Sequence, residues 1–223
     1  MIPLHDTIPS RSWPLVTFLL IVVNVLVFLY ELSLGPVLDR FLLIYGFIPE
    51  RYLRIAQVDP WNLPARFGPM LTSMFLHGGW LHLIGNMWML WIFGDNVEDR
   101  LGKGRYLLYY LVCGLAAVYL HYLTGPLSRI PVVGASGAIA GVMGGYFVLF
   151  PHARIVALIP IFFFLHVITV PAVLFLAFWF FMQLFNGMVA TAASFGGGVA
   201  WWAHVGGFLA GGLMILPFRR SRF

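Results

Sequence analysis

The chain consists of long apolar stretches separated by short segments that carry nearly all of its charged residues. From Tyr106 to Phe218 the only charged residues are Arg129 and Arg154. Because a helix needs about 20 mostly apolar residues to cross a bilayer, this stretch must contain several spans joined by short connections. We predict six spanning helices and hence an all-α, polytopic membrane protein. The expected spans are approximately Pro14–Leu34, Leu71–Phe93, Tyr106–Thr124, Val133–Phe150, Pro171–Asn186 and Val199–Pro217.

The segments between these spans differ in character. Ala153–Val170 is apolar but contains Pro160, so we interpret it as an interfacial or partly buried connection and not as a seventh span. Gly35–Met70 is long and rich in proline and aromatic residues, so we expect it to carry structure of its own at the membrane interface. The pair Gly78-Gly79 predicts that the second helix starts late, at about Trp80.

Composition agrees with this pattern. Hydrophobic residues make up 61% of the 223 residues and charged residues only 9%, whereas soluble domains have roughly 25% charged residues. A chain with so little charge cannot cover a surface that faces water, and its hydrophobicity is too high for a disordered chain. A soluble globular enzyme and a disordered protein are therefore both excluded. Cys113 is the lone cysteine, so an intrachain disulfide is excluded as well.

The chain has a net charge of +5. In a membrane protein, basic residues between the spans determine the orientation in the bilayer, so we expect the lipid bilayer and no nucleic acid as a partner. With the N-terminus in the cytoplasm, eight basic residues lie inside and five outside, and four of those five fall in the long Gly35–Met70 connection. This bias predicts that both termini are cytoplasmic. The first span has no small-residue cleavage site, so we expect a retained anchor. We find no organelle-targeting extension and expect the bacterial cytoplasmic membrane.

Polar residues within spans are the best indication of function in such a chain. His82 and Asn86 lie four residues apart in the second span and therefore share one helix face, with His77 just before them. Their side chains offer hydrogen-bond donors to a common point. An equally good interpretation is that they only form hydrogen bonds between helices.

Ser136 lies at the predicted start of the fourth span, between Gly134 and Gly137. Small residues recur every four positions at Gly137, Gly141 and Gly145, a pattern that lets another helix approach closely. The free backbone N–H groups at a helix start could hold an oxyanion while a serine attacks a carbonyl carbon. Taken alone, however, a serine in a span is more often structural.

His204 lies in the sixth span and shares a helix face with Gly207 and Gly211. The imidazole is therefore expected to face whichever helix packs on these glycines. A lone histidine in such a place is more often a structural residue with satisfied hydrogen bonds.

The topology strengthens the functional interpretation of the polar residues in the second, fourth and sixth spans. The second, fourth and sixth spans run in the same direction, so Ser136, His204 and His82 can meet at similar depth, as acyl-transfer chemistry requires. The last five predicted spans contain no Asp or Glu. We therefore expect a Ser-His dyad in a site without a carboxylate, and we exclude an aspartyl protease and a zinc protease of the HExxH type.

With these motifs in this order, the sequence resembles the rhomboid family of intramembrane serine proteases over nearly the whole chain. The resemblance implies a single rhomboid-like domain, residues 1–223, with a bundle of six transmembrane helices. It implies that Ser136 is the nucleophile and His204 the general base, and that His82, Asn86 and the Ser136 backbone N–H bind the oxyanion. It implies supporting roles for His77, Gly134, Gly137, Gly207 and Gly211.

The resemblance also implies how substrates are handled. Gly35–Met70 would be a membrane-embedded first loop and Met188–Gly198 a cap over the site. Substrates would be transmembrane proteins, cut in or near their helices without a cofactor or metal. Ala140 stands where some members carry an aromatic side chain on the histidine, and Gly68-Pro69 stands where many carry a Trp-Arg pair. How His204 is held therefore stays open.

Two other functions remain as alternatives. A rhomboid-like protein could bind membrane helices without cutting them. A small transporter or channel could line its pore with His82, Asn86 and His204, although the chain shows no internal repeat. The natural substrate, the oligomeric state and the gating element, either the cap or the fifth span, are not determined by the sequence.

Overall fold

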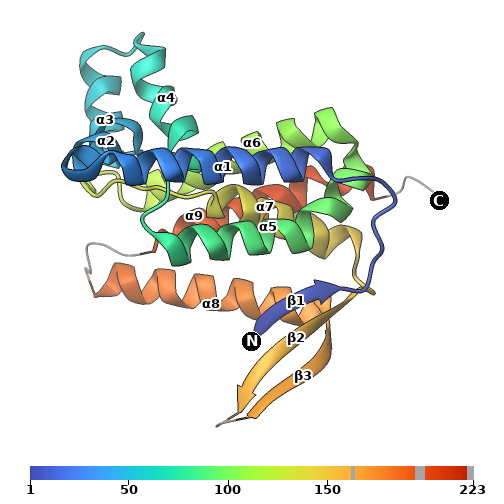
Figure 1. Cartoon of the computed structure of the whole chain (residues 1–223). Helices are drawn as coiled ribbons and strands as arrows, with labels where there is room; N and C mark the ends of the chain where they lie inside the picture. Colours follow the sequence, from blue (N-terminus) through green and yellow to red (C-terminus); the bar gives the residue numbers. More distant parts are fainter. Residues whose placement is uncertain (162–163, 194–198, 220–223) are drawn as a thin grey trace.

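The computed structural model describes residues 1–161, 164–193 and 199–219, and in these ranges it is mainly a bundle of long helices (Figure 1). The long helices are α1 (Leu15–Ser33), α5 (Trp80–Leu101), α6 (Lys103–Thr124), α7 (Ser136–Leu149), α8 (Ala172–Ala192) and α9 (Trp201–Met214). Shorter helices are η1 (Gly35–Val37), α2 (Leu38–Tyr45), α3 (Pro49–Val58), α4 (Leu63–Thr72), η2 (Ser73–Phe75) and η3 (Leu216–Phe218). The strands are β1 (Ile2–Asp6), β2 (Arg154–Ile161) and β3 (Phe164–Pro171).

Each of the six predicted spans corresponds to one long helix, and the expected late start at Trp80 is confirmed. Among the described residues, α1, α6, α8 and the segment Trp201–Phe218 are long and apolar enough to cross a membrane. The chain is a polytopic, mostly helical integral membrane protein. Of the two remaining long helices, α5 ends in a run of charged residues and α7 has only 14 residues.

Helix α7 lies in the middle of the bundle (Figure 1). Every residue from Gly137 to Tyr146 is buried, so this helix is surrounded by protein on all sides. At 1.5 Å per residue, α7 is about 21 Å long, which is shorter than the hydrocarbon core of about 30 Å. At least one end of α7 must therefore lie below the membrane surface.

Helices α7 and α9 pack with their backbones in direct contact. A Cβ atom at Gly207 would collide with the backbone oxygen of Gly137, and one at Gly211 with that of Gly141. Tyr109 of α6 donates its hydroxyl hydrogen to the same Gly141 oxygen at 2.7 Å. The glycine face of α9 thus packs directly on the backbone of α7. A Cβ atom at the predicted stripe of Gly137, Gly141 and Gly145 would first meet side chains of α6, namely Ala117, Cys113 and Tyr109. The α7–α9 contact brings together the ends at which both helices begin, here called the serine end of the bundle.

The opposite end is held by acidic side chains at the end of α5. Glu98 accepts hydrogen bonds from the backbone N–H groups of Val16 and Thr17, at 3.0 and 2.8 Å, and so caps α1, which has no capping side chain of its own. Helix α5 continues through this charged run to Leu101. Gly102 then adopts φ +79° and joins α5 directly to α6.

The segment predicted to be a non-spanning connection forms a β-hairpin. Strands β2 and β3 pair antiparallel, and β1 from the N-terminus adds to the other edge of β2. Pro160 is tolerated because it lies beyond the part of β2 that pairs with β1. Asp6 links β1 to the bundle through Tyr146 and Asn96, and burial raises the pKa of its carboxyl. The segment is therefore not a seventh helical span, as predicted, and its β-branched residues explain the strands. Its position at the membrane interface stays a prediction.

Both loops implied by the resemblance include helical segments. The first loop contains η1, α2, α3 and α4, and its residue Phe47 pairs through backbone hydrogen bonds with Val132 in the segment before α7. The expected cap, Met188–Gly198, begins inside α8, which continues to Ala192. Positions 194–198 of that cap lie outside the described residues.

The α7–α9 contact yields a stability prediction. Replacing Gly211 by Ala forces a methyl group against the backbone of α7, and we expect the free energy of unfolding in detergent micelles to fall by about 1–3 kcal/mol or more. The matched control is Gly85→Ala in α5, where a Cβ would have nothing within 4 Å. We expect that control to keep or slightly raise stability, because alanine favours helix over glycine. Equal unfolding of both variants would contradict the proposed packing.

Candidate active site

Ser136 and His204 meet at the serine end of the bundle. Ser136 is the first residue of α7 and His204 lies in the first turn of α9. The Ser136 Oγ and His204 Nε2 atoms are 2.8 Å apart, a hydrogen-bond distance. The two helices can place these side chains side by side because their glycine faces bring the backbones together. The structure thus brings together the serine and histidine that the sequence singled out.

The other ring nitrogen of His204 contacts a residue that the sequence analysis did not single out. Gln183 Oε1 of α8 lies 2.8 Å from His204 Nδ1, and both side chains are buried. The rings of Trp179 and Trp201 lie beside the imidazole, with centroids at 5.9 and 6.2 Å. These contacts hold His204 without an aromatic side chain at position 140. An amide within an apolar span was the signal that could have identified Gln183.

His82 lies at the start of α5 and faces the segment that carries Ser136. The backbone N–H of Gly78 donates to His82 Nδ1 at 3.4 Å, so the ring hydrogen resides on Nε2. A Cβ atom at Gly134 would lie 2.7 Å from this Nε2 and 3.6 Å from Ser136 Oγ. Gly134 also adopts φ +126°, a conformation that favours glycine. The Nε2–H group of His82 therefore borders the space next to Ser136.

Asn86 and His77 form a second contact of the same cluster. Asn86 is buried, and its Nδ2 donates to His77 Nε2 at 3.0 Å. The rings of His77 and His82 lie edge to face, with centroids 5.1 Å apart. His77 thus orients the Asn86 amide, which has a second hydrogen left for another acceptor.

A carboxylate reaches this cluster from the first span. Glu31 of α1 is 1% exposed, and both of its carboxylate oxygens lie 3.2 Å from the backbone nitrogen of His77. The expectation of a site without any carboxylate therefore needs a correction. The last five predicted spans contain no acidic residue, but Glu31 lies in the first, and α1 packs against α5 and brings it to the segment before that helix. Among the described residues, no carboxylate forms a hydrogen bond with His204.

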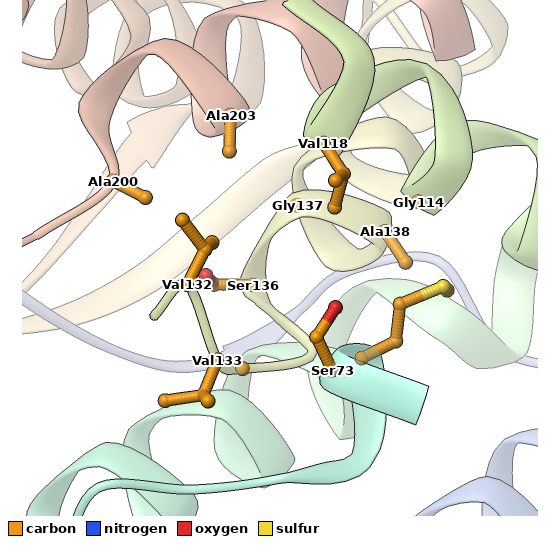
Figure 2. Close-up of a pocket in the computed structure, with 12 residues that line it drawn as sticks. Ser73, Gly114, Val118, Val132, Val133, Ser136, Gly137, Ala138, Ala200 and Ala203 are labelled. Carbon is orange, nitrogen blue, oxygen red and sulfur yellow. The ribbon is translucent and has the colours of Figure 1, made fainter. Parts of the chain in front are cut away.

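A small cavity opens beside Ser136 (Figure 2). Its lining comes from η2, α6, the segment before α7, and the starts of α7 and α9: Ser73, Met74, Gly114, Val118, Val132, Val133, Gly134, Ser136, Gly137, Ala138, Ala200 and Ala203. The space for the centre of a water molecule is about 10 Å³, which is enough for about one water. The backbone N–H groups of the first turn of α7 have no partner within the helix, so this end attracts negative charge.

The chemistry of the site is that of neutral polar groups. In the part of the chain that the structure describes, no group of three or more His, Cys, Asp or Glu side chains is arranged to hold a metal ion. The cluster instead offers a hydroxyl, a hydrogen-bond acceptor on an imidazole, and several N–H donors around one small space. A hydroxyl beside a base, with N–H donors close by, is suited to nucleophilic attack on a carbonyl group.

Comparisons with known proteins point to one family. The family model of the Rhomboid domain matches residues 64–221. The putative rhomboid protease YdcA of Bacillus subtilis is 34% identical over 136 residues, which are 61% of this chain and 62% of that protein. The rhomboid protease GluP of Bacillus subtilis is 37% identical over 132 residues, 59% of this chain and 24% of GluP. A mitochondrial presenilin-associated rhomboid-like protein A of Danio rerio is 33% identical over 98 residues, 42% of this chain and 25% of that protein.

The matched regions are partial. The chain spans less than two thirds of the length of each of these relatives. The range matched by the family model nevertheless contains His77, His82, Asn86, Ser136 and His204. Glu31 lies before the matched region.

The Glu31 contact predicts a loss of stability when its acceptor is removed. In Glu31→Leu the buried backbone N–H of His77 loses its hydrogen-bond acceptor. We therefore expect the free energy of unfolding in micelles to fall by about 1–3 kcal/mol. Glu31→Gln keeps an oxygen acceptor and should lose less. Wild-type stability in Glu31→Leu would show that the contact does not stabilise the protein.

Proposed function

The chain belongs to the rhomboid family, and on this premise we propose that it is an intramembrane serine protease that hydrolyses peptide bonds in or near the transmembrane helices of other membrane proteins. The observation that carries the proposal is the 2.8 Å contact between Ser136 Oγ and His204 Nε2 at the start of two central helices. The names of the Bacillus subtilis relatives, both called rhomboid proteases, support it.

The proposed reaction has two steps. In the first, His204 Nε2 takes the hydroxyl proton as Ser136 Oγ bonds to the carbonyl carbon of the substrate. The tetrahedral intermediate then collapses, the C–N bond breaks, and the imidazolium returns its proton to the leaving amine. In the second step, His204 deprotonates a water molecule that attacks the acyl ester. The C–O bond to Ser136 then breaks, the imidazolium returns its proton to Ser136 Oγ, and the carboxylic acid and free Ser136 are released.

The oxyanion of each intermediate needs donors that are already in place. We assign this role to the Nε2–H of His82, the backbone N–H of Ser136 and the second amide hydrogen of Asn86. Gly78 fixes the hydrogen of His82 on the correct nitrogen, and His77 holds the Asn86 amide. The start of α7 adds its dipole. No cofactor is required, because these donors stabilise the developing charge.

Water must reach a serine that lies within the membrane. The short helix α7 favours a position of Ser136 below the outer surface, provided that its other end lies near the inner surface. The cavity beside Ser136 has room for about one water molecule, as the second step requires. We place the site in the outer half of the bacterial cytoplasmic membrane, with both termini in the cytoplasm, because of the basic residues of the inner segments.

Removal of either dyad residue tests the function. We expect Ser136→Ala and His204→Ala to slow cleavage of a reporter with one transmembrane helix by roughly 10³-fold or more in proteoliposomes. Ser33→Ala, at an exposed serine at the end of α1, is the control and should cleave like the wild type. A fluorophosphonate probe should label the wild type and not Ser136→Ala. Full cleavage by either dyad variant would refute the proposal, whereas helix binding without cleavage or labelling would favour a non-proteolytic role.

The oxyanion assignment predicts a change in kcat more than in KM. We expect His82→Ala to lower kcat by roughly 10²–10³-fold, because a donor to the transition state is lost. The control is His166→Ala, at an exposed histidine of β3. Steady-state kinetics with the same reporter distinguish the variants, and a kcat of His82→Ala within twofold of the wild type would rule out this assignment.

A further inference from the structure

Gln183 is a buried amide in the middle of an apolar helix, and the proposed reaction does not yet use it. The side chain of Gln183 is 7% exposed, that of His204 is 8% exposed, and their contact joins α8 to α9. We propose that Gln183 is a positioning residue that fixes the tautomer of His204 so that Nε2 can act as a base. This inference rests on the proposed function and adds a third member to the dyad.

The orientation of the Gln183 amide is determined by a backbone group. Gln183 Nε2 lies 3.2 Å from the backbone oxygen of Trp179, one turn earlier in α8. A carbonyl oxygen can only accept a hydrogen bond, so the NH₂ group must face Trp179. The Oε1 atom must then face His204 Nδ1, and these two atoms lie 2.8 Å apart.

The tautomer of His204 follows from this orientation. Because Oε1 of Gln183 can only accept, His204 Nδ1 must carry the ring hydrogen and donate it. In the neutral ring, Nε2 then has a free lone pair, and this is the atom that lies 2.8 Å from Ser136 Oγ. A carbonyl group of α8 thus determines, through one amide, which nitrogen of His204 is the base.

The surroundings favour a neutral partner for His204. Among the residues that the structure describes, the imidazoles of His82 on α5 and His121 on α6 are the titratable groups that act electrostatically on His204. No carboxylate among the described residues forms a hydrogen bond with it. A buried carboxylate would stabilise the imidazolium but would cost desolvation energy in a membrane. An amide fixes the tautomer without that cost, and the rings of Trp179 and Trp201 restrict the imidazole further.

The first test separates positioning from substrate binding. We expect Gln183→Leu to lower kcat by about 10–100-fold with KM nearly unchanged, because part of the enzyme then carries the hydrogen on Nε2. This is a smaller loss than the roughly 10⁴-fold effect of a wrong tautomer in serine protease triads. The matched control is Asn186→Leu, which removes the other amide of α8 and should retain the wild-type kcat.

The second test uses the pH profile, which a merely structural role would not move. In Gln183→Glu the carboxylate can still accept from Nδ1 and its charge favours the protonated imidazole. We expect retained activity and an acid limb of the kcat profile that shifts to higher pH by about one unit. Wild-type kcat in Gln183→Leu, or an unshifted limb in Gln183→Glu, would overturn the inference. These outcomes are distinct from failure of the function itself, in which the wild type would neither cleave nor label at Ser136.

Discussion

Contact between the backbones of α7 and α9 is the constraint on which the rest of the structure depends. It exists only because glycines stand at the crossing, where any side chain would meet a carbonyl oxygen. In a bilayer there is little hydrophobic driving force between helices, so close packing and hydrogen bonds must hold the bundle together. The contact also sets the separation of Ser136 and His204, since each lies in the first turn of one partner helix. Stability and site geometry therefore share one cause.

The candidate site is a network of polar groups in which most partners are neutral. Each imidazole has its hydrogen placed by a neighbour that can act only as a donor or only as an acceptor. Gly78 N–H faces Nδ1 of His82, and the Gln183 oxygen faces Nδ1 of His204. Glu31 contributes a carboxylate, but to the backbone of His77 and not to the base. Unpaired buried polar groups are costly, so a connected network of this kind is expected to be rigid.

Membrane depth connects the fold to the proposed chemistry. A central helix of 14 residues cannot reach both surfaces, so a residue at its end can lie inside the bilayer and still border a space for water. The acidic end of α5 fixes the start of α1 at the other end of the bundle, through Glu98 and its two backbone hydrogen bonds. The N-terminal strand adds a further link there through Asp6.

The sequence by itself determined the membrane class, the six long helices and the residues Ser136, His204, His82 and Asn86. Apolar length and isolated polar groups in spans are local properties, and they can be read without knowing which helices touch. Only the tertiary structure decided that Gln183 and Glu31 belong to the same cluster, because each reaches it from another helix, α8 or α1, whose packing the local pattern does not show. It also decided that the connection after α7 is a hairpin, since β1 pairs with it from the N-terminus. Hydrogen-bond partners on different helices have no signature in the local pattern, and this is why the contact that sets the tautomer of His204 appeared only in the folded chain.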